Sequence, residues 1–205
     1  ERGQIECRFA KPVYDGHQAQ VIGTVDGDHL EIKVESDGQL CATGRASLPA
    51  DGPQPPALAD YTYVAPPAER PPADETSLAP GNVLCTAPEE LKRSWLDDYL
   101  RDVRETDTRY AEQAIAHPGI LLRLCNAALK DNVVLAPWIH VGSRVQNFSL
   151  ARVGEVLSAR TKVTANTERK GHRFVDMDCL ILANGDRPVA QVAHTAIYQL
   201  RQLAA

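Results

Sequence analysis

Residues 115–129, IAHPGILLRLCNAAL, decide the fold, because a His-Pro-Gly turn runs directly into an apolar segment with the pattern of a helix. Pro118 is typical of a first helical turn, and Asn132 suits the end of the helix. After the turn, only Arg123 and Asn126 interrupt the apolar sequence. A helix that is apolar all round must be covered all round, so we expect a long antiparallel sheet to curl about it.

The segments on both sides of this helix alternate apolar and polar residues, which is typical of antiparallel strands. Residues 4–48 contain Asp-Gly pairs at 26–27 and 37–38 and predict a meander of hairpins, and Asn184-Gly185 marks another hairpin. The strands expected after the helix are WIHVGSRVQNFSL (138–150), EVLSARTKVTANTERK (155–170), HRFVDMDCLILA (172–183) and PVAQVAHTAIYQL (188–200).

Prolines are concentrated in one part of the chain, since ten of the fourteen lie between Pro49 and Pro88. Proline lacks a backbone donor and interrupts helices, so we predict an extended connector over 49–88 that lies against the domain. Apolar residues at helical spacing then predict a helix over 87–105, with Thr86 and Pro88 as its start signals.

The two strand-rich stretches also resemble each other, in the same order. FAKPVYDGHQAQV (9–21) parallels FSLARVGEVLSAR (148–160), and DGQLCATGRASL (37–48) parallels NGDRPVAQVAHTAI (184–197). We infer a tandem duplication whose first copy lacks its helix, either because the chain continues ahead of residue 1 or because the first module is truncated. The expected parts are a partial first module of strands at 1–48, the connector at 49–88 and a complete second module at 89–205.

Composition narrows the classes of protein and partner. The 205 residues are 43% hydrophobic and 24% charged, which is ordinary for a globular protein. With a net charge of −5 and no basic stripe, nucleic acid is not an expected partner. No apolar run reaches the about 20 residues of a membrane span, so we expect a cytoplasmic protein. The five cysteines are widely spaced without a CxxC pair, so we expect packed, reduced thiols, no metal and no cofactor.

Together, HPGILLRLCNAAL (117–129) and the strand-rich segments 138–163 and 168–198 resemble a hotdog module of the MaoC-like acyl dehydratase and enoyl-thioester hydratase group. The resemblance covers residues 90–200, and 5–48 looks like the last strands of a first module. It implies an α+β fold, a tandem (double) hotdog with the first module incomplete at its N-terminus. It also implies a homodimer that acts on acyl groups carried as thioesters by coenzyme A or an acyl carrier protein.

In that family, an amide at the start of the central helix points at the thioester carbonyl. Free N–H groups there stabilise the negative charge that develops on the carbonyl oxygen. The turn before that helix commonly reads Ala-His-Gly in the family. His117 and Gly119 match its His and Gly, with Pro118 inserted between them, so the resemblance makes Gly119 the donor to that oxygen. The residues alone leave an alternative, in which Gly119 permits a tight turn and His117 caps the helix.

Family hydratases carry an Asp-x-Asn-Pro-x-His segment, whose Asp and His share a water and act as general acid and base. The corresponding stretch is ETDTRY (105–110), with Glu105, Asp107 and Tyr110 at the Asp, Asn and His positions. Tyrosine, with an ordinary pKa of about 10, is a poor replacement for histidine. Glu105, Tyr110 and His117 are therefore the candidate catalytic residues of a degenerate site.

Other polar residues are candidates for substrate contact. Asn126 is placed on the central helix to orient a substrate or a water, and His140 lies in a predicted strand. Arg169 and Lys170 belong to ERKGHR (168–173), a basic turn suited to the phosphates of coenzyme A. For the Asn and the His the alternative is a hydrogen-bonded structural role, and for the basic turn it is a solvated hairpin tip.

The resemblance thus predicts a lyase of fatty acid or polyketide metabolism, a hydratase or dehydratase that adds or removes water beside a thioester. Because Tyr110 stands where a histidine is expected, the alternative is a non-catalytic hotdog subunit that binds acyl-thioesters or stabilises an active partner module. A hotdog thioesterase ranks lower, because such enzymes place a carboxylate on the central helix and residues 119–130 contain none.

Overall fold

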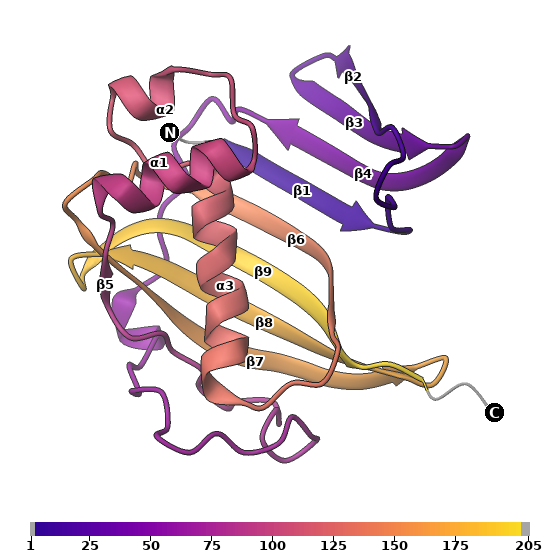
Figure 1. Ribbon diagram of the computed structural model, residues 1–205. Coiled ribbons are helices and arrows are strands. Elements are labelled where there is room, and N and C mark those ends of the chain that lie inside the picture. Colours follow the sequence, from indigo (N-terminus) through magenta and orange to yellow (C-terminus); the bar gives the residue numbers. More distant parts are fainter. Residues whose placement is uncertain (1–2, 202–205) are drawn as a thin grey trace.

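The computed structural model describes residues 3–201, which form one antiparallel sheet of nine strands in the order β2-β3-β4-β1-β6-β9-β8-β7-β5 (Figure 1). The strands are β1 (Gln4–Phe9), β2 (Gln20–Asp26), β3 (His29–Ser36), β4 (Gln39–Ser47), β5 (Glu89–Glu90), β6 (Ile139–Asn147), β7 (Val156–Arg169), β8 (His172–Ala183) and β9 (Arg187–Gln199). The helices are α1 (Arg93–Asp102), α2 (Arg109–Glu112), α3 (Pro118–Asn132) and the 3-10 turn η1 (Leu58–Asp60).

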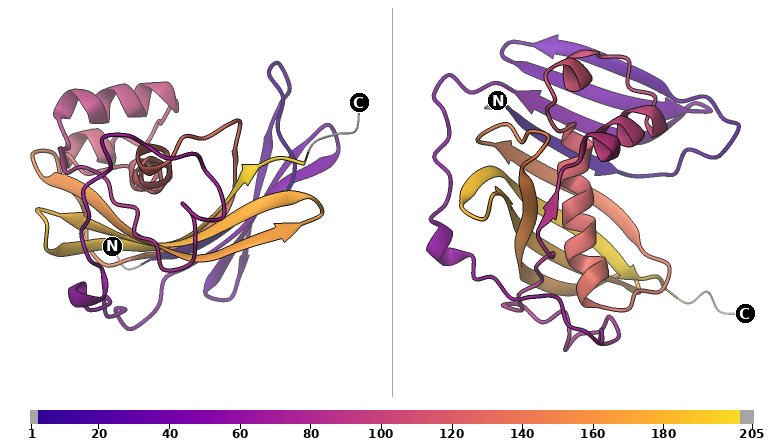
Figure 2. Two further views of the ribbon diagram at one scale, coloured as in Figure 1. Left: turned by 90° about the horizontal axis from the view of Figure 1, so that it is seen from below. Right: turned by 60° about the vertical axis from the view of Figure 1, so that its left-hand side comes forward.

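The strands β1–β4 repeat the arrangement of β6–β9. Within each set, the first strand lies beside the fourth, followed by the third and the second. β1 and β6 pair antiparallel at the centre, with Cys7 opposite Ser143, and this pairing joins the two sets into one sheet. α3 crosses β6–β9 and does not reach over β2–β4 (Figures 1 and 2). The duplicated order of strands is therefore present, and the division of the chain at residues 48 and 88 stays a prediction.

Two of the predicted hairpins are confirmed by their backbone angles. Asp37 and Asn184 have φ of 50° and 54°, and the glycines that follow, Gly38 and Gly185, have φ of 70° and 88°. Two successive positive φ values characterise the type I′ turn, whose twist matches that of the flanking strands. Glycine and a small polar residue are needed there, because other side chains adopt this conformation at a cost.

α3 begins at Pro118 and ends at Asn132, as the sequence predicts. Its buried side packs on the inward residues of β6–β9 and consists of Ile120, Leu121, Leu124, Cys125, Ala128 and Leu129. The prediction that a sheet encloses this helix on every side is wrong, because Leu122, Asn126 and Ala127 are only half buried. A single sheet layer contacts one side of a helix, and the β1–β4 half of the sheet stands away from α3 (Figure 2).

The helix predicted over 87–105 is shorter than expected. α1 spans Arg93–Asp102 and is preceded by Lys92, which makes no side-chain cap. Thr86 is not its start signal, because its hydroxyl accepts a hydrogen bond from the N–H of Ala159 at 2.9 Å. Residues 87–91 are held against β7 instead, where β5 pairs with the start of that strand.

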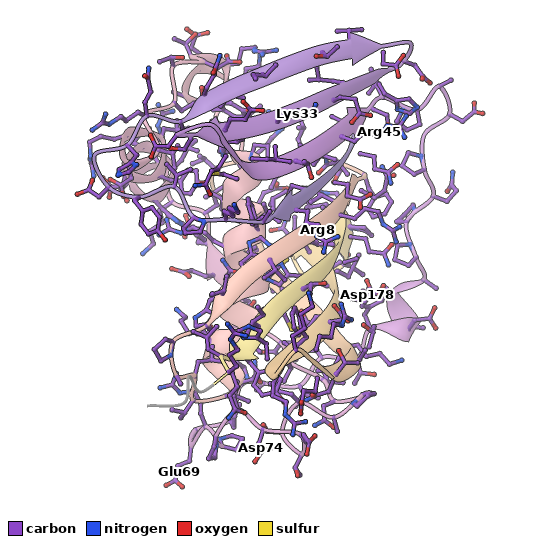
Figure 3. The ribbon with its side chains drawn as sticks, turned by 90° about the vertical axis from the view of Figure 1, so that its right-hand side faces the viewer. Arg8, Lys33, Arg45, Glu69, Asp74 and Asp178 are labelled. Carbon is purple, nitrogen blue, oxygen red and sulfur yellow. The ribbon has the colours of Figure 1, made fainter. Side chains whose placement is uncertain are left out.

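The proline-rich segment follows the edge of β7 before it reaches α1. The N–H groups of Leu84 and Thr86 donate to the carbonyls of Thr161 and Ala159 at 2.9 and 3.0 Å. We call the side of the sheet that faces α3 the inner face and the other side the outer face. Tyr61 anchors the segment on the outer face, where its hydroxyl donates to Asp178 at 2.7 Å (Asp178 is labelled in Figure 3).

Four of the five cysteines, Cys41, Cys85, Cys125 and Cys179, are buried, as expected for packed thiols. None of the helices within residues 3–201 has the length and apolar character needed to cross a lipid bilayer.

Candidate active site

Glu105 lies directly after α1, where the chain turns back toward α3. Arg104 has a φ of 54°, and the N–H groups of Arg104 and Glu105 donate to the carbonyls of Arg101 and Leu100 at 3.1 and 2.9 Å. This pair of bonds is the Schellman pattern, which closes the end of a helix around a left-handed residue. The turn fixes the position of Glu105 relative to a rigid helix.

The carboxylate of Glu105 is held by three hydrogen bonds. Oε1 accepts from the N–H groups of Thr106 and Asp107, both at 2.8 Å, and Oε2 lies 3.1 Å from Nε2 of His117. The side chains of Glu105 and His117 are 23% and 20% exposed. Mainly because of the hydrogen bond from Asp107, the pKa of Glu105 lies below its ordinary value. Glu105 is therefore an ionised carboxylate in a fixed orientation.

His117 caps α3 with its side chain. Nδ1 accepts a hydrogen bond from the N–H of Gly119 at 3.0 Å, so the network assigns the proton of the neutral ring to Nε2, which donates to Glu105. The carbonyl of His117 accepts a hydrogen bond from the N–H of Ile120 at 2.9 Å, and Pro118 has no N–H. In this arrangement, the first three residues of α3 present no free amide. The hydrogen bond from Gly119 is the one expected if His117 caps the helix. The role of Gly119 as an oxyanion donor stays a prediction, and it requires the His117 ring to move.

Two tyrosine rings contact the ring of His117. The ring centroid of Tyr110 lies 4.8 Å from that of His117, and the centroid of Tyr99 lies 5.2 Å away. Burial raises the pKa of both hydroxyls, so both are protonated at neutral pH. Tyr110 also lines a cavity of about 330 Å³ together with Pro118 and Leu121.

Tyr99 is a site residue that the sequence analysis missed. A Cβ atom at position 119 would lie 1.8 Å from the hydroxyl oxygen of Tyr99, so the close approach of α1 to α3 requires glycine there. The guanidinium of Arg123 lies 5.3 Å from the centre of the Tyr99 ring. Helical spacing in the sequence places Tyr99 on the buried side of its helix, but no local pattern connects it to Gly119.

A second cavity, of about 450 Å³, is lined by Glu105, Asp107 and Thr108. Asp107 accepts hydrogen bonds from the side chain of Arg109, both at 2.9 Å from Nε. Arg109 thereby lowers the pKa of Asp107 to about 2. Asp107 therefore forms an ion pair with Arg109, and Glu105 is the carboxylate that contacts His117.

His140 lies away from this group. β6 runs from Ile139 to Asn147, and Asn147 is the end that lines the Tyr110 cavity. His140, at the other end, lies 2.8 Å from the hydroxyl of Ser143, which lies 2.9 Å from Nδ1 of His194. Burial lowers the pKa of His194 to about 3. This cluster has the hydrogen bonds of a structural group, and a substrate-binding role for His140 stays a prediction.

Arg169 and Lys170 form the tip of the β7–β8 hairpin, far from α1 and from the start of α3 (Figure 1). The guanidinium of Arg169 lies 5.0 Å from the centre of the Phe174 ring and 3.5 Å from the carboxylate of Asp176. Asn126 lies on α3, and within residues 3–201 its buried Oδ1 has no hydrogen-bond partner. The structure thus brings Glu105, Tyr110, His117 and Gly119 together and leaves the basic turn apart from them.

No protein-family model matches the chain, and no curated protein matches it. Several solved structures match the chain in fold. A protein of Chloroflexus aurantiacus J-10-fl, assigned as a MaoC domain dehydratase, aligns with a TM-score of 0.60 and 12% identity, over 98% of this chain and 76% of its own. A conserved hypothetical protein of Mycobacterium tuberculosis with a double hotdog fold aligns with a TM-score of 0.59 and 16% identity, over 96% of this chain and 74% of its own.

The chain is a double hotdog protein. A protein of Lactobacillus plantarum assigned as an oleoyl thioesterase also aligns, with a TM-score of 0.51 and 14% identity, over 98% of this chain and 77% of its own. At these identities the likeness is one of fold, so the reaction has to be argued from the residues at the start of α3.

Proposed function

We propose that this double hotdog protein is an acyl-thioester hydratase or dehydratase, acting on acyl groups carried by coenzyme A or an acyl carrier protein. The observation that carries the proposal is the contact of 3.1 Å between Oε2 of Glu105 and Nε2 of His117 at the start of α3. An ionised carboxylate that orients a neutral imidazole is suited to general acid and base catalysis. The similarity in fold to a protein assigned as a MaoC domain dehydratase supports the same reaction.

In the hydration direction, the His117 ring first turns so that Nδ1 leaves the N–H of Gly119. Nδ1 then takes a proton from water while the water oxygen bonds to the β carbon of the enoyl thioester. The electron pair of the double bond moves toward the thioester, and its oxygen becomes negative. The amide of Gly119, which the turn of the ring has freed, stabilises the negative oxygen. Nδ1 then gives its proton to the α carbon, which completes the addition and leaves the ring neutral, and dehydration is the reverse sequence.

Within this proposal, Glu105 holds Nε2 of His117 and stabilises the imidazolium that forms. Tyr110 keeps its proton and lines the cavity beside His117, so its part is contact with the substrate. A homodimer and a cytoplasmic location belong to the same proposal, and the molar mass from light scattering measures the first.

The second candidate is a non-catalytic hotdog subunit that binds acyl-thioesters or stabilises an active partner module. It is favoured by the hydrogen bond from Gly119 to His117, which occupies the amide needed for catalysis. A thioesterase ranks third, although one structure of similar fold is assigned that activity. The only carboxylate of α3 is Asp131, near its C-terminal end and beside Lys130.

The test is an assay of the purified protein with enoyl and 3-hydroxyacyl thioesters of several chain lengths. We expect interconversion, and a loss of kcat of about 100-fold or more in Glu105→Gln and in His117→Gln. Asp107→Asn is the matched control, because Asp107 lines the same cavity as Glu105 but pairs with Arg109. Its kcat should stay within a few-fold of the parent.

Three outcomes would reject the proposal. Activity that is indifferent to both substitutions places the chemistry elsewhere. Binding of thioesters without turnover identifies the non-catalytic subunit. Release of the free carrier thiol without addition of water identifies a thioesterase.

A further inference from the structure

The outer face has a groove of about 730 Å³ where the two sets of strands meet. Its charged lining consists of three arginines and one glutamate, namely Arg8 and Glu6 of β1, Arg144 of β6 and Arg169 of β7. We call it the arginine groove. Small-molecule sites commonly have volumes of about 300–1,000 Å³. In a chain with a net charge of −5, the groove is a local concentration of positive charge with the size of a ligand site.

The register of the strands places Arg8 and Arg144 beside each other on the outer face. Ile5 and Val145 point to the inner face, where Val145 is buried in the core and Ile5 packs against it. Side chains alternate along a strand, so Arg8 and Arg144 point the other way. Arg8 lies opposite Gly142, two residues from Arg144, and such diagonal neighbours are about 7–8 Å apart. Figure 3 shows Arg8 at this junction, and both guanidinium groups can reach one ligand there.

Neither of these guanidinium groups is neutralised by the protein. Within residues 3–201, Arg8 and Arg144 form no ion pair and no side-chain hydrogen bond. Arg45, on the same face, differs from them because its Nε lies 2.9 Å from the carboxylate of Glu31. Glu6 is opposite Arg144 in the pairing of β1 with β6, but the two side chains are not in contact. Arg8 and Arg144 are therefore available to an anion from solution.

Two carboxylates of β8 on the outer face are engaged by other groups. Asp176 accepts a hydrogen bond from the hydroxyl of Thr195 at 2.5 Å and lies 3.5 Å from the guanidinium of Arg169. Asp178 accepts from the hydroxyl of Tyr61 at 2.7 Å. These contacts leave Glu6 as the carboxylate in the lining of the arginine groove, against three guanidinium groups.

The floor of the arginine groove is made of small residues. Gly142 lies beside Arg8, and Ala193 lies beside Arg144 in the neighbouring row. A Cβ atom at position 142 would lie 2.8 Å from the carbonyl oxygen of Cys7, so the close approach of β1 to β6 requires glycine there. Because these two positions carry little or no side chain, the long arginines stand above a low floor on which a ligand can rest.

We propose that the arginine groove binds the diphosphate group of a small organic molecule. A guanidinium binds phosphate oxygens through two parallel hydrogen bonds, and two guanidinium groups at diagonal positions offer one to each phosphoryl group. The ring of Phe174 lines the same groove and offers an apolar surface to the organic part of the ligand. The ligand is distinct from the thioester proposed for His117, because His117 caps α3 on the inner side and the sheet lies between.

The experiment is a calorimetric titration of the purified chain with inorganic pyrophosphate, in a phosphate-free buffer of fixed ionic strength. We expect saturable binding at one site per chain, with a Kd of about 1 mM or lower. Arg8→Gln and Arg144→Gln should each raise the Kd at least about 10-fold, because each removes a charged donor of two hydrogen bonds. Both side chains are exposed and without a partner in residues 3–201, so we expect an unchanged Tm for the free variants.

Lys33→Gln is the matched control for the loss of charge. Lys33 lies on the outer face in the row of Arg8, two strands away, and does not line the arginine groove (Figure 3). At physiological salt its Kd should stay within about two-fold of the parent value, because salt screens charges over this distance. Ala193→Leu keeps every charge but fills the floor, so it should raise the Kd at least about 5-fold.

Two results of the pyrophosphate titration would overturn the proposal. One is the lack of saturable binding. The other is an equal rise in Kd for Lys33→Gln and Arg144→Gln, which would show a general attraction of anions to the outer face.

A titration with an enoyl-coenzyme A identifies the source of the diphosphate, because coenzyme A carries one as well. We expect its Kd to be the same for the parent and for Arg8→Gln. A rise of about 10-fold or more in Arg8→Gln would place the diphosphate of the carrier in the arginine groove and overturn a separate ligand. The pyrophosphate titration measures binding without turnover, so its result is independent of whether the protein is a hydratase.

Discussion

Oε2 of Glu105 and Nε2 of His117 lie 3.1 Å apart, although one follows α1 and the other precedes α3. Because His117 also caps α3 through Gly119, this contact links the end of one helix to the start of the next. The same atoms therefore determine local stability and the proposed chemistry.

Acid is expected to remove the stability that Glu105 contributes. The pKa of Glu105 is lower in the folded protein than its ordinary value of 4.5, chiefly because the N–H of Asp107 donates to it. A carboxyl of this kind stabilises the fold fully above the unfolded pKa and loses that effect as the pH falls through the folded pKa. The difference in Tm between the parent and Glu105→Gln should be largest near neutral pH and vanish in strong acid. A difference that is constant with pH would contradict an effect of charge.

Burial of His194 predicts a second pH dependence at milder acidity. Its pKa falls from 6.5 to about 3 in the folded protein, because burial disfavours the charged ring. The unfolded chain therefore binds a proton that the folded chain does not, and stability decreases as the pH falls from 6.5 toward 3. Urea unfolding of His194→Gln should show a flatter decrease than the parent. His172→Gln, at the tip of the β7–β8 hairpin, is the control, and an equal flattening there would reject the assignment.

Gly119→Ala should destabilise the contact between α1 and α3. The added Cβ would lie 1.8 Å from the Tyr99 hydroxyl oxygen and 2.9 Å from Cζ of that ring, so Tyr99 must shift. We expect the free energy of unfolding to fall by about 1–3 kcal/mol, the usual cost of overpacking. Tyr99→Phe removes the nearer atom, so the double variant should recover part of the loss in urea unfolding. Simple additivity of the two changes would show that this contact is not the cause.

Tyr61→Phe should loosen the proline-rich segment from the outer face. The Tyr61 hydroxyl donates to Asp178 at 2.7 Å and accepts from Nε2 of Gln191 at 2.9 Å. Loss of a hydrogen bond to a charged group costs about 1.5–3 kcal/mol. We expect a fall of this size in the free energy of unfolding and faster proteolysis within the segment. Tyr63→Phe, whose side chain is 40% exposed, is the control and should leave both measurements unchanged.

Local rules predicted the parts of the fold that depend on neighbours in sequence. The bounds of α3 followed from Pro118 and the apolar run, and two hairpins followed from Asp-Gly and Asn-Gly pairs. The start of α1 was wrong, because Thr86 bonds to β7, a contact that no local pattern encodes. The enclosure of α3 was wrong for the same reason, since it depends on the path of distant strands.

The sequence predicted which residues belong to the candidate site, but it did not predict which of them contact each other. Glu105, Tyr110, His117 and Gly119 were selected from the sequence and lie together. The sequence alignment with the family segment paired Glu105 with Tyr110, whereas the structure places Glu105 against His117. Tyr99 was missed because its importance comes from the space that Gly119 leaves, and that space is a property of two packed helices.

The two ends of the nine-stranded sheet differ in a way that affects how molecules associate. The edge of β7 is occupied by the proline-rich segment and β5, whereas β2, at the other end, pairs only with β3 and is exposed along its seven residues. A bare edge is a template for a strand of another molecule. Two molecules that pair through β2 use both of these templates at once, so misassociation through this strand would end at two molecules and would not extend into a fibre.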